Sequence, residues 1–221
     1  MPPLRPFPPM KPLSCVAALA LALALVSNSG CQIIPAPQPD PTHYYTLAIP
    51  ASMETALPSP TATLRIGLNP VDLAPYLRKG VLVVRSGGNE VVFNDFARWA
   101  EPLDVGIARA LQMSLTTDPR IAHVWLSPLS MDDHRDFDVT VHIRRADGVL
   151  SASGASVRFV AIVDISKPGD PPRLVLQKAF TAPAIAWDGR DYGAMAGALS
   201  KAVLELSKDI ADSLPAAPAK N

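Results

Sequence analysis

The feature that most restricts what this chain can fold into is Cys31, which follows a long apolar run. The run, residues 13–26, is preceded by two basic residues and followed by small ones. It is shorter than the roughly 20 residues that an α-helix needs to cross a bilayer. A basic start, a short apolar stretch and a small-residue cleavage site are the three parts of a secretory signal peptide. Residues 1–30 are therefore predicted to be a removable lipoprotein signal and not part of the fold.

Cleavage between Gly30 and Cys31 allows the cysteine to carry a diacylglyceryl thioether and an amide-linked acyl chain. Each buried methylene contributes about 0.8 kcal/mol, so several chains together anchor a protein stably. Asn28 departs from the pattern, because lipoprotein signals usually carry an aliphatic residue three positions before the cysteine. The alternative is an ordinary signal peptidase site at residues 27–29, which leaves Cys31 as a free thiol. The prolines that crowd the first twelve residues are explained if translation begins at Met10.

Removing residues 1–30 from the 221 leaves a chain long enough for one domain with its own core. Cys15 leaves with the signal, so Cys31 has no disulfide partner and stability must come from apolar burial. Arg5 and Lys11 also leave, and 18 of the 20 basic residues then face 20 acidic ones. Binding of nucleic acid by counterion release needs a basic stripe, which this chain lacks. No second stretch approaches the length of a membrane span.

Residues 31–42 are predicted to form an extended, proline-rich tether. Prolines stand at alternate positions, 35, 37, 39 and 41, and this spacing favours polyproline geometry.

Runs rich in β-branched and aromatic residues, separated by turn residues, predict eight strands. They are residues 44–49, 63–71, 81–85, 90–93, 122–127, 137–145, 156–165 and 174–181. The third and fourth flank Ser-Gly-Gly-Asn and form the clearest hairpin, because glycine tolerates the positive φ of a tight turn. The last three are expected to form an antiparallel meander. Within 137–145, apolar residues at odd positions alternate with polar ones, so one face is packed and the other wet. Residues 53–63, 75–77 and 131–136 are predicted loops.

Two amphipathic helices are predicted. One opens at Glu101-Pro102, since proline is tolerated at the first helical position; its apolar face consists of Leu103, Ile107, Leu111 and Leu115. The other spans about 192–214 and has an apolar stripe of Met195, Leu199, Val203, Leu206 and Ile210. Gly193 and Gly197 are spaced for close packing of this helix on the sheet. The predicted fold class is α+β, a two-layer sandwich of an antiparallel or mixed sheet covered by two main helices. The domain is expected to span 43–214, with a flexible tail at 215–221.

No motif in the sequence carries catalytic or metal chemistry. The four histidines form no H-E-x-x-H pair, and the chain has no G-x-S-x-G elbow and no glycine-rich phosphate loop. The one dense polar cluster, residues 132–136, lacks the glycine spacing of a calcium loop and is predicted to be a solvated turn. We therefore expect no catalytic residue, no cofactor and no metal.

One segment is more specific. Residues 89–103, N-E-V-V-F-N-D-F-A-R-W-A-E-P-L, closely resemble the signature of ABC-type transport auxiliary lipoproteins, the family of paraquat-inducible protein C. Three other segments agree with that family: Tyr44-Tyr45-Thr46-Leu47, residues 69–71 with 75–77, and the last helix after residue 191. The resemblance covers about residues 43–214.

The resemblance implies a non-catalytic lipoprotein that faces the periplasm. Members of this family are thought to be accessories or adaptors of ABC transport systems built on MCE (mammalian cell entry) domain proteins, which move lipids or hydrophobic compounds between the inner and outer membranes. The implied partners are an MCE-domain protein, its ABC transporter or permease, membrane lipid through Cys31, and further copies in a ring-like homo-oligomer. Gln32 after the cysteine fits release to the outer membrane, with retention in the inner membrane as the alternative. A free-standing periplasmic lipid or small-molecule binding lipoprotein is the second hypothesis, and an envelope hydrolase is the third.

An adaptor needs a contact surface, and tyrosine, tryptophan and arginine concentrate binding energy at interfaces. The expected partner-binding residues are Tyr76, Leu77, Phe93, Arg98 and Trp99. Trp99 has a second interpretation as a core residue, because it stands just before a predicted helix. Arg98 is expected to be exposed, since a buried arginine requires a paired carboxylate.

Overall fold

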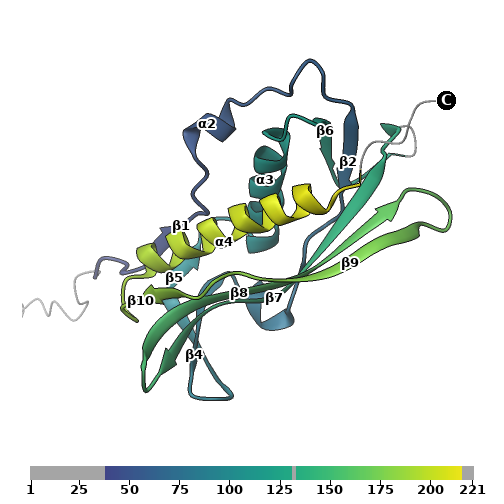
Figure 1. Ribbon diagram of the computed structural model, residues 1–221. Coiled ribbons are helices and arrows are strands. Elements are labelled where there is room, and N and C mark those ends of the chain that lie inside the picture. The colour runs from purple at the N-terminus through teal and green to yellow at the C-terminus, as the bar shows by residue number, and fades with distance from the viewer. Residues whose placement is uncertain (1–37, 131–132, 216–221) are drawn as a thin grey trace, which may run out of the picture. The chain divides into compact units, whose positions relative to one another are not determined.

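The computed structural model describes residues 38–130 and 133–215. All the helices and strands described here lie in the unit that begins at Pro41 (Figure 1). The predicted signal, the lipidation at Cys31 and nearly all of the predicted tail lie outside the described residues. Within the described residues, no helix is both long enough and apolar enough to span a membrane.

Ten strands, three α-helices and one 3₁₀ helix make up the described fold. In chain order they are β1 (His43–Tyr45), α2 (Ala51–Glu54), β2 (Leu64–Leu68), β3 (Asp72–Leu73), η1 (Pro75–Lys79), β4 (Val81–Ser86), β5 (Glu90–Trp99), α3 (Leu103–Thr116), β6 (Ile121–Leu126), β7 (Phe137–Ser151), β8 (Gly154–Lys167), β9 (Arg173–Thr181), β10 (Ile185–Trp187) and α4 (Tyr192–Ser213).

The strands form one mixed sheet organised around the long antiparallel hairpin of β7 and β8. On its other edge, β7 pairs in parallel with β2 near its start and with β4 near its end, and β3 pairs between them. β6 lies beyond β2, while β5 and then β1 lie beyond β4. The outer edge of β8 carries β9 and β10. The predicted α+β class and the antiparallel meander of β7, β8 and β9 are therefore confirmed.

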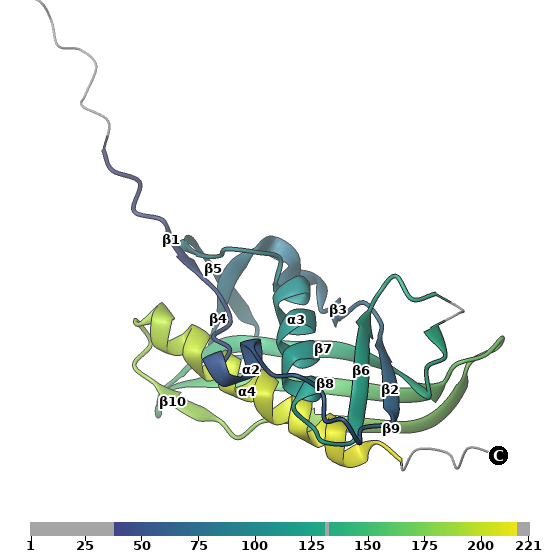
Figure 2. The ribbon, with the colours of Figure 1, turned by 90° about the horizontal axis from the view of Figure 1, so that it is seen from above.

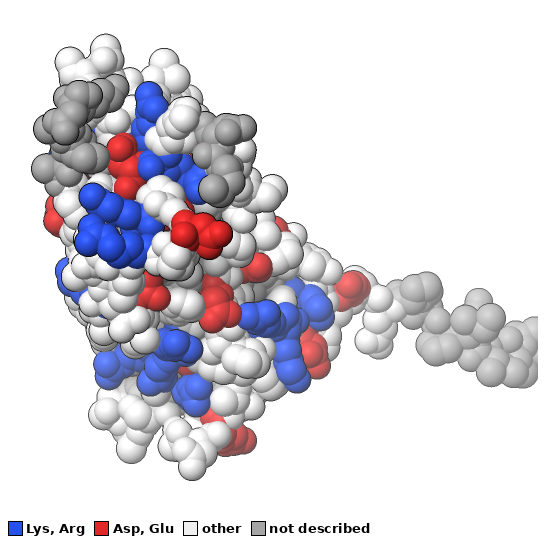
Figure 3. Space-filling view, turned by 90° about the vertical axis from the view of Figure 1, so that its right-hand side faces the viewer, with Lys and Arg blue, Asp and Glu red and all other residues white. Residues whose placement is uncertain are grey.

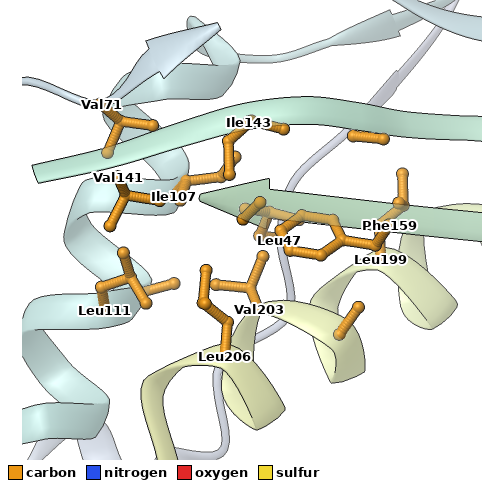
Figure 4. Close-up of a cluster of buried hydrophobic side chains, with 14 of the residues drawn as sticks. Leu47, Val71, Ile107, Leu111, Val141, Ile143, Phe159, Leu199, Val203 and Leu206 are labelled. Carbon is orange, nitrogen blue, oxygen red and sulfur yellow. The ribbon is translucent and has the colours of Figure 1, made fainter. Parts of the chain in front are cut away.

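Helices α3 and α4 cover one face of this sheet (Figures 1 and 2). α3 packs on β6 and α4, and α4 packs on β8 and β10. The side chains between them form the core, as Figure 4 shows for Ile107, Leu111, Ile143, Phe159 and Leu206. Burying a side chain of this size contributes about 1.5–3 kcal/mol. The two predicted helical stripes are at most 4% exposed, so both are confirmed.

Strand β1 ends at Tyr45, so residues 46–49 of the predicted strand lie outside it; its start at His43 is explained by the prolines before it. The backbone N–H of Ala100 donates to the carbonyl of Tyr45 at 2.8 Å, so the backbone groups of Tyr45 face β5. Backbone groups of alternate residues face the same neighbouring strand. Going back in steps of two from Tyr45 reaches His43, then Pro41 and Pro39, which have no N–H to donate. The strand therefore begins no earlier than His43.

Because β1 begins only at His43, part of β5 has no neighbouring strand on one side in the described chain. β1 pairs with residues 97–99 of β5 only, in parallel register. Within the described part of the chain, residues 90–96 of β5 have no strand on that side.

The structure corrects several local predictions. The 53–63 loop is preceded by the short helix α2, residues 75–77 begin the 3₁₀ helix η1, and the second hairpin strand continues to Trp99. β3 and β10 were not predicted, because two- and three-residue strands carry too few residues to show alternation. The prediction for Gly193 and Gly197 is wrong: a Cβ at Gly197 would meet no atom within 4 Å, so this face of α4 is open.

Arg135, in the polar cluster predicted to be a solvated turn, is largely buried. The side chain of Arg135 is 7% exposed and its Nε donates to Asp138 Oδ1 at 2.6 Å. Asp138, predicted to lie on the wet face of its strand, is 8% exposed. The cause is Gly67 in β2, where a Cβ would lie only 2.4 Å from Asp138 Oδ1. The missing side chain makes room for the ion pair over the strand.

Candidate functional site

Tyr76 belongs to a hydrogen-bonded cluster around a fully buried carboxylate. Asp147 Oδ2 accepts from Tyr76 Oη at 3.0 Å and from Arg85 Nε at 2.9 Å. Asp147 Oδ1 accepts from Arg145 Nη2 at 2.9 Å. The guanidinium of Arg85 also lies over the Tyr76 ring, 4.9 Å from its centre. Burial raises the pKa of Tyr76, and the hydrogen bond with Tyr76 raises the pKa of Arg85. The cluster ties η1 and β4 to β7, and sequence analysis missed it because its members are far apart in the chain.

Leu77 and Trp99 lie in the core, at 1% and 8% exposure. The backbone N–H of Trp99 donates to the carbonyl of Gly80, a residue whose φ of 71° suits glycine. Trp99 thus follows its second interpretation, as a core residue. The side chains of Leu77 and Trp99 pack inside the domain, and their role in partner binding stays a prediction.

Phe93 and Arg98 are both half-buried and lie on β5. Lys79 Nζ lies 4.1 Å from the centre of the Phe93 ring. Arg98 stands beside Tyr44 of β1 in the parallel register. Tyr44 and Phe96 are 64% and 56% exposed and were not among the predicted site residues. The alternation in Phe96-Ala97-Arg98-Trp99 was the available signal, since Ala97 and Trp99 are the buried positions.

An apolar groove of about 560 Å³ opens along the outer side of α3. Its walls are the β2–β3 connection, α3 and the end of β6; the lining residues include Leu68, Val71, Val105, Ala108, Met113 and Leu126. Arg109 also lines it and pairs with Glu101. Arg109 Nε is buried and has no hydrogen-bond partner among the described residues. The groove has the size and apolar lining of a small-molecule site. A groove of this kind is what the second hypothesis, a free-standing binding lipoprotein, requires.

The histidine nearest to carboxylates is His142 on β7. Its Nδ1 lies 3.1 Å from Asp72 Oδ2 and its Nε2 lies 3.4 Å from Asp164 Oδ2. The hydrogen bond from His142 lowers the pKa of Asp72. Both of these contacts of His142 are with carboxylates. Among the residues that the structure describes, no group of histidine, cysteine and acidic side chains is placed to hold a metal.

Charges of both signs share the surface. On the face shown in Figure 3, lysine and arginine side chains are interspersed with aspartate and glutamate. This face offers no extended patch of a single sign. The distribution agrees with the nearly balanced composition.

The fold and its surface indicate the class of protein, a binding domain. An α+β domain with an open apolar groove and half-exposed aromatic and basic side chains on one sheet edge is equipped to bind a partner or a ligand. Comparison with known proteins identifies the family. The sequence model of the ABC-type transport auxiliary lipoprotein component matches residues 45–211, and the chain belongs to this family. That membership indicates a transport accessory role without catalysis, in the cell envelope.

Solved structures share the fold. Protein XCC0632 from Xanthomonas campestris, described under the family DUF330, is 17% identical, with a TM-score of 0.63 over 77% of this chain and 93% of that one. A second crystal structure, of a protein described as uncharacterized, is 16% identical, with a TM-score of 0.61 over 79% of this chain and 99% of that one. The search of curated proteins gives no match.

Proposed function

We propose that this protein is a non-catalytic envelope lipoprotein that acts as an accessory or adaptor of an MCE-type ABC transport system. The system moves lipids or other hydrophobic compounds between the inner and outer membranes. The observation that carries the proposal is the family match, which spans nearly the whole described domain.

The proposed anchor is the lipidated Cys31, in the outer membrane and facing the periplasm. The tether of residues 31–42 then sets how far the domain reaches from the bilayer. In polyproline geometry its twelve residues extend for about 37 Å, at about 3.1 Å per residue.

The proposed protein partners are an MCE-domain protein and its ABC transporter or permease. Of the predicted contact residues, Tyr76, Phe93 and Arg98 keep exposed atoms. Tyr76 is also a member of the Asp147 cluster, so Phe93 and Arg98 are the better positions for a test. Phe93 is half-buried and packs against the core, so the folding of its variant is checked before binding is measured.

The test is a crosslinked pull-down of the tagged full-length protein from its native envelope, with partners identified by mass spectrometry. We expect an MCE-domain protein, with a lower yield for Phe93→Ala and Arg98→Ala. Lys208→Ala, on the exposed side of α4, is the matched control. A yield that is unchanged in both variants refutes this contact surface, and absence of any transport component refutes the adaptor function. Native mass spectrometry of the same preparation tests the proposed ring-like homo-oligomer.

The groove beside α3 favours a second function, a free-standing lipid or small-molecule carrier. Ala108→Trp places an indole in the groove, and Ala194→Trp places one on the open side of α4. A carrier purifies with bound lipid that only Ala108→Trp loses. Equal lipid content in the wild type and both variants excludes the groove as the carrier site.

A further inference from the structure

We propose that one face of the β1–β5 edge docks on the membrane that carries the Cys31 lipid. The face consists of Tyr44 and Phe96, and we call it the anchor-side patch. The proposal rests on the proposed lipid anchor. It adds to that anchor a contact between the folded domain and the phospholipid interface.

The patch is apolar and aromatic, and it is exposed. Tyr44 and Phe96 are 64% and 56% exposed. Tyr44 stands beside Arg98 in the β1–β5 register, and Phe96 precedes Arg98 by two residues, so Tyr44 and Phe96 lie on one side of the sheet. The residues between and after them, Ala97 and Trp99, point into the core. Tyrosine side chains suit a membrane interface, because an apolar ring carries a polar hydroxyl that stays in water.

The backbone of β5 holds Phe96 outward. Arg98 pairs with Val81 and Phe93 pairs with Val83, so four β5 residues, 94–97, stand opposite the single residue Leu82. Bulges of this kind change the direction of a side chain. The side chain of Asn94 accepts a hydrogen bond from the backbone N–H of Phe96 at 3.0 Å, which stabilises the bulge. Packing inside the domain does not require a phenyl ring at this position.

The tether brings the anchor to this edge. The chain from Cys31 enters the fold at β1, the strand that carries Tyr44. The twelve residues before β1 limit the distance from anchor to edge to about 40 Å, at no more than about 3.3–3.6 Å per residue. Pro39 and Pro41 lack the N–H that pairing with β5 at these positions would need. Of the described domain, this edge is therefore the part joined most directly to the anchor.

The charges around the patch nearly balance. Arg98 and Lys79 are basic, while Glu90 and Asp95 are acidic. The apolar side chains, and not the net charge, would therefore drive docking. We expect docking on zwitterionic as well as anionic phospholipid, with little dependence on salt.

The experiment uses the full-length lipidated protein in vesicles of phosphatidylethanolamine and phosphatidylglycerol. When Cys31 is acylated and Cys15 is removed with the signal, an introduced cysteine is the one free thiol of the mature sequence. Asp95→Cys carries an environment-sensitive fluorophore next to an intact patch, and Leu174→Cys carries it on β9, where the native side chain is 57% exposed. We expect blue-shifted emission, quenched by doxyl-labelled lipid, at position 95 and not at 174. Adding Phe96→Ser should reduce the quenching at 95.

Three results overturn the proposal. Water-like emission at both positions means that the domain stands away from the bilayer. A blue shift at 95 without quenching by doxyl lipid means that a protein, such as a second copy, covers the patch. An intact mass that lacks the acyl chains removes the lipid anchor itself, and with it this proposal; the intact mass is measured first, so this failure is distinguished from a failure of docking alone.

Discussion

Replacing the buried carboxylate of Asp147 should destabilise the domain more than any other single change of charge among the described residues. Asp147 is 0% exposed and accepts hydrogen bonds from Arg85, Arg145 and Tyr76. Asp147→Asn keeps the size of the side chain but removes the charge, which leaves two arginines facing an amide. Removing one partner of a buried pair costs about 3–5 kcal/mol. Because the side chains of Arg85 and Arg145 are 24% and 35% exposed, water compensates part of this cost, and we expect about 3 kcal/mol.

The assay is urea unfolding of the Cys31→Ser protein, followed by circular dichroism, with the wild-type domain sequence as reference. For a domain of this size, 3 kcal/mol corresponds to a fall in Tm of about 6–12 °C. Asp164→Asn is the matched control, because that carboxylate is 24% exposed and faces His142; we expect a cost below about 1 kcal/mol. Tyr76→Phe, which removes one hydrogen bond to the buried carboxylate, should cost about 1.5 kcal/mol. Equal, small losses for Asp147→Asn and Asp164→Asn would refute the view that the cluster stabilises the fold.

Three further predictions each concern one residue. Gly197→Ala should stabilise the domain by about 0.4–1 kcal/mol in the same unfolding assay, because the added methyl group meets open space and alanine favours a helix; a loss of stability would contradict the open face. The pKa of Asp72 is lowered, so its contacts with His142 and Arg78 stabilise the fold above the ordinary pKa of 3.8, and this contribution is lost as the pH falls through the lower folded pKa. The difference in unfolding free energy between wild type and Asp72→Asn should therefore shrink below about pH 4. A difference that does not change with pH would contradict this prediction. Cys31→Ser should move the protein from the membrane to the soluble fraction after cell fractionation, and persistent membrane association would count against a single lipid anchor.

Periodicity was a sufficient guide to the layers of this fold. The spacing of Leu103, Ile107, Leu111 and Leu115 predicted a buried helical face, and the alternation from Phe137 to Ile143 predicted a strand with one packed face. Both signals are clear because the residues that make up these two faces are apolar. The paired carboxylates behaved differently: Asp138 lies on the predicted wet face and Asp147 lies beyond the end of the predicted strand 137–145, yet both are buried. Their arginine partners and the glycine beneath Asp138 are brought close by sheet pairing, which the local sequence does not show.

The candidate site was less accessible to sequence reasoning, for a related reason. Residue type pointed to Trp99 and Leu77 as contact residues, because large side chains are common both at interfaces and in cores. Only the folded structure distinguishes a contact residue from a core residue here. The groove beside α3 has no sequence pattern, since its walls come from three segments that meet only in the folded chain.

The segment that resembles the family signature, residues 89–103, contains buried residues that the core needs and outward-facing residues that it does not need. Ala97, Trp99 and Leu103 are buried, so packing explains why residues of these types occupy these positions. Phe96 and Arg98 alternate with them and face outward, where packing gives no reason for an aromatic ring or a guanidinium. Substitutions at 97, 99 and 103 should therefore lower stability, while substitutions at 96 and 98 should leave stability nearly unchanged and alter what the protein contacts. The two sets can be separated by measuring unfolding and membrane or partner binding on the same variants, so the family segment itself indicates where function is to be sought.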